Sequence, residues 1–202
     1  MAEIQPPLGT ADWGPWISQI AAATANADGV IAYVYAADAI RMVKAWVEFG
    51  LKGVLAGDLD ELNRAWHRLD PWPDTVQGLT RLKRKFVLAT LSNGNVALLV
   101  NMARRAGLPW DAILGAEVTR YYKPQPGCYL GTAAMLGLKP PECALVAAHN
   151  NDLAVAQGLG FKTIFVTRPA EHGPGQTKDL TAERDWDVVA RDFFDLADQL
   201  GC

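Results

Sequence analysis

The sequence contains few cysteines and few histidines, and neither set is clustered. The three cysteines and three histidines are widely spaced (Cys128, Cys143 and Cys202; His67, His149 and His172). An odd, scattered set of cysteines gives neither a disulfide framework nor metal-ligand spacing. These absences predict a reducing, cytoplasmic location and offer no metal-ligand spacing, and no cofactor is expected.

The sequence also lacks an excess of positive charge and any long apolar run. The net charge is -3, so no basic surface suggests nucleic acid as a partner. No apolar stretch is long enough to span a bilayer, and the first residues, Met1-Ala-Glu-Ile, lack the basic start of a signal peptide. Hydrophobic residues make up 50% and charged residues 20% of the 202 residues, as expected for one globular domain with a small insertion at most.

The most informative stretch begins with a short apolar run, Ala144 to Ala148, which is typical of a strand buried on both faces of a parallel sheet. The polar cluster His149-Asn150-Asn151-Asp152 follows it, and then come a helix of small residues and a second strand, Thr163 to Val166. Open α/β sheets bind ligands at the carboxyl ends of their strands. Asp152 is therefore either a carboxylate of a ligand site or a cap of the following helix.

A second stretch ends in polar residues in the same way. Phe86 to Leu91 is predicted to be a strand, and Ser92-Asn93 lies between it and a helix from Asn95 to Ala106. The free N–H groups at the start of that helix form an anion site. By structure alone, Ser92 is equally suited to cap the helix.

A third stretch places a lysine in a stiffened loop. Lys123 is followed by Pro124 and Pro126, which restrict the backbone before a helix from Cys128 to Gly137. Further helices are expected at Thr75 to Arg84 and at Asp187 to Leu200, and Asp111 to Glu117 is expected to be a connection.

The order of these stretches is strand-Ser-Asn, then Lys-Pro-x-Pro, then strand-loop-Asp. It resembles the haloacid dehalogenase superfamily, and most closely the type II 2-haloacid dehalogenases, over Leu59 to Gly201. The resemblance implies an α/β fold with a Rossmann-like parallel sheet core (residues 1–15 and 75–202) and a shortened helical cap (residues 16–74). Strands 86–91, 144–148 and 163–166 are expected to be parallel neighbours.

The resemblance also implies a site for a small carboxylate substrate. It gives catalytic roles to Lys123, Asp152, Thr10 and Ser92, and substrate-binding roles to Asn93, Tyr129, His149 and Asn150. Lys123 would offset the negative charges of substrate and nucleophile, and Asp152 would hold that lysine and position water. The single carboxylate in Asn150-Asn151-Asp152 favours the metal-free branch over phosphatases, whose Mg²⁺ needs several oxygen ligands. A homodimer is compatible with this assignment.

The N-terminal segment departs from the pattern of that family, in which an apolar strand ends in a nucleophilic Asp and Gly-Thr follows after two residues. Leu8-Gly9-Thr10 fits the end of the pattern, but Pro6 stands where the Asp is expected. Ala2-Glu3-Ile4-Gln5 is too short and too polar for a central strand, and prolines cannot donate to its ladder. Val30 to Tyr35 is strand-like and precedes Asp38, but no Gly-Thr follows it.

Three functions stay open on the sequence alone. The first is a hydrolytic 2-haloacid dehalogenase that acts through an aspartyl ester and has an altered N-terminus. The second is a catalytically silent homologue that still binds small carboxylates, and the third is a phosphatase-type hydrolase of the same fold. Because loss of a covalent nucleophile commonly costs ~10⁴ or more in rate, we expect little or no dehalogenation by this chain.

Overall fold

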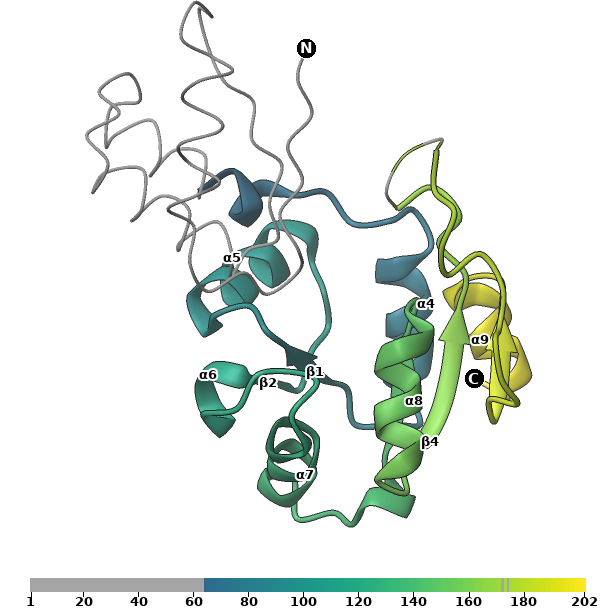
Figure 1. The fold of residues 1–202 in the computed structure, drawn as a ribbon. Coiled ribbons are helices and arrows are strands. Elements are labelled where there is room, and N and C mark those ends of the chain that lie inside the picture. The colour runs from purple at the N-terminus through teal and green to yellow at the C-terminus, as the bar shows by residue number, and fades with distance from the viewer. Residues whose placement is uncertain (1–63, 172, 174) are drawn as a thin grey trace, which may run out of the picture. The chain divides into compact units, whose positions relative to one another are not determined.

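The structure, a computed structural model, describes residues 64–171, 173 and 175–202. The chain divides into two compact units, Met1–Ala65 and Trp66–Cys202, and the helices and strands described below belong to the second (Figure 1). The Gly9-Thr10 turn, the strand expected at Val30 to Tyr35 and most of the expected cap lie outside the described residues. The division into core and cap therefore stays a prediction.

Five short strands form two parallel sheets. β1 (Ala89–Ser92) pairs with β2 (Ala112–Gly115), with Ala89 opposite Ala112. β3 (Ala144–Ala147), β4 (Lys162–Val166) and β5 (Val188–Ala190) form the second sheet in that order. All three pairings are parallel, which confirms the α/β class with a parallel sheet.

One expected pairing is wrong. Strands β3 and β4 are parallel neighbours as predicted, but β1 pairs with β2, a segment expected to be only a connection. The N–H groups of Asp111 and Ala112 both donate to the carbonyl of Leu88, at 2.7 and 3.3 Å, and start this ladder. At its far end, a Cβ on Gly115 would lie 2.2 Å from the Ser92 carbonyl oxygen, so only glycine allows this approach.

Helices connect and cover these strands (α4, Thr75–Leu82; α5, Val96–Ala106; α6, Ala116–Thr119; α7, Pro126–Met135; α8, Asn150–Gly158; α9, Phe193–Gln199), with single 3₁₀ turns at η1 (Trp66–Arg68) and η2 (Pro140–Glu142). The cap of α5 is Asn95, whose side chain accepts a hydrogen bond from Leu98 N at 2.7 Å. The alternative that Ser92 caps this helix is therefore wrong. Gly107 ends α5 in the left-handed conformation, as expected.

The C-terminal segment is a strand followed by a helix, whereas one helix was expected from Asp187 to Leu200. Val188–Ala190 extends the sheet as β5, and α9 begins only after Asp192, whose side chain accepts from Asp195 N. Two β-branched residues in β5 favour the strand. Asp187 fixes its start, because its carboxylate accepts from both the N–H and the hydroxyl of Thr163 in β4.

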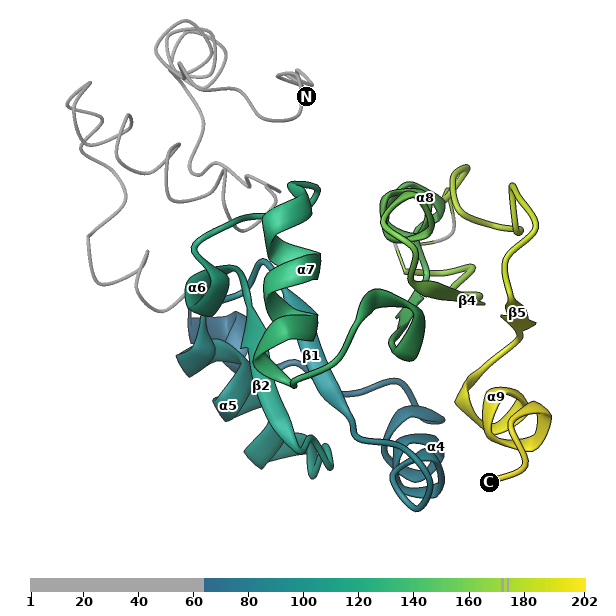
Figure 2. The same cartoon turned by 90° about the horizontal axis from the view of Figure 1, so that it is seen from below.

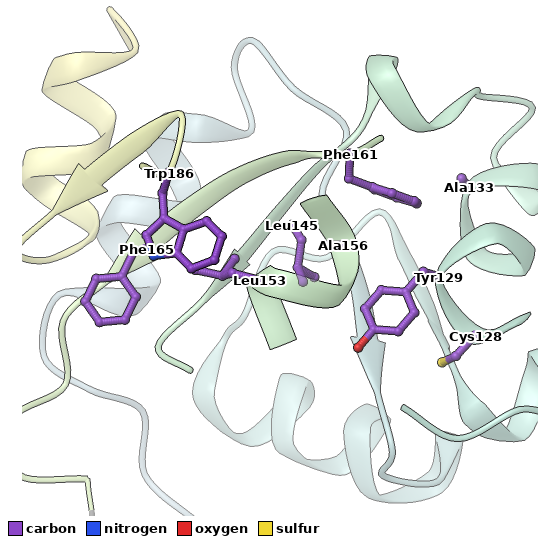
Figure 3. Close-up of a cluster of buried hydrophobic side chains, with 9 residues drawn as sticks. All are labelled: Cys128, Tyr129, Ala133, Leu145, Leu153, Ala156, Phe161, Phe165 and Trp186. Atoms are coloured by element: carbon purple, nitrogen blue, oxygen red, sulfur yellow. The ribbon is translucent and has the colours of Figure 1, made fainter. Parts of the chain in front are cut away.

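Both faces of β4 are buried. Phe165 faces a cluster with residues of α7, α8 and β3, including Tyr129, Leu145 and Leu153 (Figure 3). Ile164 and Val166 face the opposite way, into a second cluster with α4 and α9. In Figure 2, α7 and α8 accordingly lie on one side of the strands, and α4 and α9 lie on the other. This layering leaves the carboxyl ends of the strands as the place where polar loops meet.

An ion pair joins the second cluster to the loop after β4. Arg168 Nη2 lies 2.8 Å from Asp74 Oδ2, and both side chains are 11% exposed. The same carboxylate accepts from Phe193 N at the start of α9, and the Arg168 guanidinium lies over the rings of Trp72 and Phe193. Asp74 therefore ties α4 to α9. Among the described helices, none is both long and apolar enough to cross a membrane.

Candidate functional site

The centre of the site is an ion pair between a loop and the first turn of a helix. Lys123, in the loop before α7, has its Nζ 2.6 Å from Oδ2 of Asp152 in the first turn of α8. The two side chains are 24% and 11% exposed, so the pair is largely shielded from water. The expected proximity of these residues is confirmed. His149 is the N-cap position of α8, which excludes the alternative that Asp152 caps this helix.

Tyr129 holds the other oxygen of the same carboxylate. Its hydroxyl donates to Asp152 Oδ1, and its ring is fully buried among the core residues of α7 and α8 (Figure 3). Burial raises the pKa of the Tyr129 phenol well above its usual range, and the hydrogen bond to the Asp152 carboxylate raises it further. The phenol therefore stays protonated and fixes the orientation of Asp152.

Asn93 positions the lysine loop. Its Oδ1 accepts from Lys123 N at 2.7 Å, and its Nδ2 donates to Lys123 O at 3.2 Å. The peptide bond that follows Lys123, to Pro124, is cis. Thus one side chain at the end of β1 fixes the backbone that carries the ammonium group. The sequence placed Asn93 near this site, but assigned it to the substrate and not to the lysine backbone.

Ser92 ends β1 beside the same loop. Its Oγ accepts from Gly94 N at 3.0 Å, which shapes the turn between β1 and α5. The hydroxyl hydrogen can then point elsewhere, because a serine hydroxyl has one donor and two acceptor positions. Its predicted role toward a substrate is compatible with this geometry and stays a prediction.

Asn150 has a structural place in the fold. The residue is 4% exposed, and its Nδ2 donates to Asp179 Oδ1 and Thr181 O, both at 3.0 Å. Its Oδ1 accepts from Glu183 N and Trp186 Nε1. These four bonds fill the capacity of a side-chain amide. Asn150 therefore ties down segment 179–186, and the prediction that it binds substrate finds no support in this arrangement.

His149 contacts the carboxylate of Glu171, a residue for which the sequence predicted no role. His149 Nε2 lies 3.0 Å from Glu171 Oε2, in the irregular loop after β4. The hydrogen bond to Glu171 raises the pKa of His149 although burial lowers it, because the carboxylate favours the imidazolium. No sequence signal identified Glu171, since it lies in a loop without a motif.

Four of the predicted site residues border one cavity. Ser92, Lys123, His149 and Asp152 lie at one end of a cavity of about 930 Å³, which is flanked by β1 and β3 and otherwise lined mainly by apolar side chains. Thr10 lies outside the described residues. Within residues 64–202, apart from 172 and 174, no group of three or more His, Cys, Asp or Glu side chains is arranged to hold a metal ion.

Curated relatives are dehalogenases. The chain is 33% identical over 112 residues to the (S)-2-haloacid dehalogenase of Xanthobacter autotrophicus. This match covers 54% of the chain and 44% of that protein. It is also 33% identical over 112 residues to (S)-2-haloacid dehalogenase 4A of Burkholderia cepacia, covering 54% of this chain and 48% of the other. The matched region thus spans less than half the length of these two relatives.

Solved structures of the same kind align over more of the chain. A crystal structure of an L-2-haloacid dehalogenase has a TM-score of 0.76 at 42% identity, covering 100% of this chain and 86% of the other. A defluorinating L-2-haloacid dehalogenase has a TM-score of 0.76 at 44% identity, covering 93% and 78%. Residues 14–160 match the family described as haloacid dehalogenase-like hydrolase, and the chain belongs to that family.

Proposed function

We propose that this chain carries the substrate site of an L-2-haloacid dehalogenase, for a short 2-haloalkanoate, without the aspartate that attacks it. The observation that carries the proposal is the shielded Lys123–Asp152 pair, which borders a cavity beside Ser92. The X. autotrophicus structure, 25% identical with a TM-score of 0.66, holds covalently bound chloropropionic acid. That likeness supports the choice of substrate class.

Lys123 is suited to an anionic substrate. An ammonium group has three donors, and Asp152 uses one of them. The remaining donors can bind a carboxylate, which a charge-assisted hydrogen bond stabilises about twice as strongly as a neutral one. Asp152 keeps the lysine in place, and Tyr129 keeps Asp152 in place. The arrangement can therefore bind a small carboxylate whether or not chemistry follows.

The proposed reaction needs a second carboxylate. In an active enzyme of this type, an aspartate oxygen forms an ester bond to C2 of the substrate while the carbon–halogen bond breaks, and halide leaves with the bonding electrons. Water then attacks the ester carbonyl, which releases the 2-hydroxy acid, restores the carboxylate and yields a proton. Pro6 has no side chain that can attack, so this chain is proposed to bind the substrate without turning it over.

Two measurements test binding and turnover separately. Titration of the protein with 2-chloropropionate, followed by ¹H NMR of the ligand, should show saturable binding that Lys123→Met weakens at least tenfold, by about 1.4 kcal/mol or more. Lys178→Met, at an exposed position, is the matched control and should bind as the unaltered chain does. Equal binding by both variants would contradict the assignment of Lys123.

Halide release, measured by ion chromatography, should be absent or very slow for the unaltered chain. It should appear when an apolar strand that ends in Asp at position 6 replaces the present N-terminus. Turnover by the unaltered chain that survives Asp38→Asn would mean that another carboxylate attacks. Magnesium-dependent release of phosphate from a generic phosphate ester would instead identify a phosphatase of the same fold.

A further inference from the structure

Two ion pairs lie at the start of α8. His149 is the N-cap position of this helix and Asp152 belongs to its first turn, so both follow β3. Asp152 Oδ2 lies 2.6 Å from Lys123 Nζ, and His149 Nε2 lies 3.0 Å from Glu171 Oε2. All four residues line the same cavity. The start of α8 therefore supplies the acid of the first pair and the base of the second.

The backbone turn that carries Glu171 is anchored to the core. β3 and β4 are parallel neighbours, so the loops that follow them leave the sheet at the same end. Glu171 N donates to Arg168 O at 3.2 Å, which closes a turn between these two residues. Arg168 pairs with Asp74 and lies over two aromatic rings. Arg168 thus fixes the start of the turn from which Glu171 reaches His149.

The charge balance of this group depends on His149. Lys123 carries one positive charge, whereas Asp152 and Glu171 carry one negative charge each at neutral pH. While His149 is neutral, the four residues have an excess of one negative charge, which opposes an anionic ligand. When His149 is an imidazolium, the charges balance. The four side chains are between 11% and 41% exposed, so water and salt screen these charges only in part.

The groups around His149 favour its charged form. The carboxylate of Glu171 is hydrogen-bonded to the imidazole, and Asp179 acts in the same direction from the far side of the helix start, where Asn150 donates to it from N and Nδ2. Burial and the ammonium of Lys123 act against the charge. The pKa of His149 is raised overall, because the two carboxylates outweigh one ammonium and the loss of water.

We propose that Glu171 is a positioning residue of the substrate site, which holds His149 as an imidazolium so that a small carboxylate meets a second positive charge in addition to Lys123. The inference rests on the proposed function, because it concerns how that same site accepts an anion. Binding of the anion and binding of a proton at His149 then favour each other reciprocally. Affinity is therefore highest where His149 is charged, and it falls as pH rises through the titration of this imidazole.

The pH dependence of 2-chloropropionate binding tests this coupling. A carboxyl group titrates near pH 4, so the ligand stays an anion from about pH 5.5 to pH 8.5, whereas a histidine changes its charge within that range. For the unaltered chain, ¹H NMR titrations should show an affinity that falls at least about threefold over the range, the size expected for one partly exposed charge interaction. His149→Gln keeps a donor but gains no charge, so its affinity should not change with pH.

Variants of Glu171 separate its charge from its place in the fold. Glu171→Gln should move the midpoint of the affinity curve to lower pH, because the carboxylate no longer stabilises the imidazolium. Glu171→Asp keeps the charge and should return the midpoint toward that of the unaltered chain. A merely structural role predicts instead the same loss of affinity at every pH, with the midpoint unchanged.

Two matched controls remove comparable groups elsewhere. Glu183→Gln removes an exposed carboxylate in the same connection between β4 and β5. His67→Gln removes a histidine that contacts Asn101 and does not line the cavity. Both should leave the midpoint where the unaltered chain has it.

The imidazole of His149 reports the coupling directly and needs no change at Glu171. Its C2–H signal is identified by its absence in His149→Gln. Saturating 2-chloropropionate should move the titration of this signal to higher pH, because the bound anion stabilises the imidazolium.

The outcomes distinguish this inference from the proposed function. Saturable binding with an affinity that is constant over the pH range would overturn the inference and leave the proposed function standing, and so would an unchanged midpoint in Glu171→Gln. Absence of binding at every pH would overturn both. A midpoint that moves to lower pH in Glu171→Gln and returns in Glu171→Asp, with the His149 signal shifted by the ligand, would uphold the role of Glu171.

Discussion

The side-chain amide of Asn93 makes two hydrogen bonds to the backbone of Lys123, accepting from its N–H at 2.7 Å and donating to its carbonyl at 3.2 Å. Asn93 lies directly after β1, whereas Lys123 lies in the loop before α7, so this contact joins two segments that the sequence separates. It holds the backbone of the residue whose ammonium lies 2.6 Å from Asp152 Oδ2.

Asn93→Ala should destabilise the fold. It removes two hydrogen bonds to the exposed backbone of Lys123, which costs about 0.5–1.5 kcal/mol. Urea unfolding followed by circular dichroism measures the change. Asn151→Ala is the control, because Asn151 is exposed, and it should change the free energy of unfolding by no more than about 0.5 kcal/mol. Equal values for the two variants would reject a positioning role for Asn93.

Tyr129→Phe should remove part of the alkaline sensitivity of the fold. Burial and the Asp152 hydrogen bond raise the phenol pKa in the folded state, whereas in the unfolded chain it is about 10. As pH rises above that unfolded value, the unfolded state loses the proton first, and stability falls. Urea unfolding at about pH 8 and pH 11 should show a smaller loss for Tyr129→Phe than for the unaltered chain.

The exposed Tyr122 provides the matched control for that experiment, since it is 54% exposed. Tyr122→Phe should keep the alkaline loss of stability seen in the unaltered chain. If Tyr129→Phe and Tyr122→Phe give the same pH dependence, the Tyr129 phenol does not carry the effect.

Asp74→Asn should cost more stability than any change at an exposed ion pair. It breaks the shielded pair with Arg168, and loss of one partner of a buried pair costs about 3 kcal/mol. The control is Asp70→Asn, because Asp70 and Arg105 are 83% and 49% exposed, and it should cost less than about 1 kcal/mol. Thermal unfolding of the two variants at neutral pH makes the comparison.

Asp74 should also contribute to acid unfolding. Burial raises its pKa, but hydrogen bonds from Phe193 N–H and from Arg168 outweigh burial and lower it overall. A lowered pKa stabilises the fold above the unfolded value of about 4, and this contribution is lost as pH falls through the folded value. Between about pH 5 and pH 2, the free energy of unfolding of Asp74→Asn should therefore fall less steeply than that of the unaltered chain.

The contribution of His149 to stability should depend on pH with the opposite sign to that of Asp74. Its pKa is raised by Glu171, so the stabilising contribution of the pair is complete below the unfolded value of about 6.5. That contribution is lost as pH rises through the folded value. His149→Gln and Glu171→Gln should each flatten the fall of the melting temperature from about pH 6 to pH 8. A slope unchanged in both variants would show that the pair does not contribute.

Much of the local structure could be predicted from residue patterns. The apolar runs before Ser92 and His149 identified β1 and β3, and Gly107 marked the end of α5. Val188–Ala190 was misassigned because three residues show no clear period, and its strand state depends on pairing with β4. Likewise, β2 became recognisable as a strand only through its ladder with β1.

The candidate site divides in the same way. The resemblance carried by the three ordered motifs already predicted that Lys123 and Asp152 would meet. The hydrogen-bond partners of the side-chain amides of Asn93 and Asn150 could not be predicted. Each of these amides has donors and an acceptor that suit many partners. Tertiary packing decides that Asn93 bonds to the Lys123 backbone and that Asn150 bonds to segment 179–186.

The sequence by itself determined β1, β3 and β4, the helices that follow β1 and β3, and the polar residues at the ends of those two strands, because apolar spacing and turn residues act locally. The tertiary structure decided which strand edges meet. β1 joins β2, β3 joins β4, and a cavity separates the two pairs. The physical reason is that every strand offers the same backbone donors and acceptors. Neighbours are therefore chosen by chain connection and by which apolar faces can be buried together.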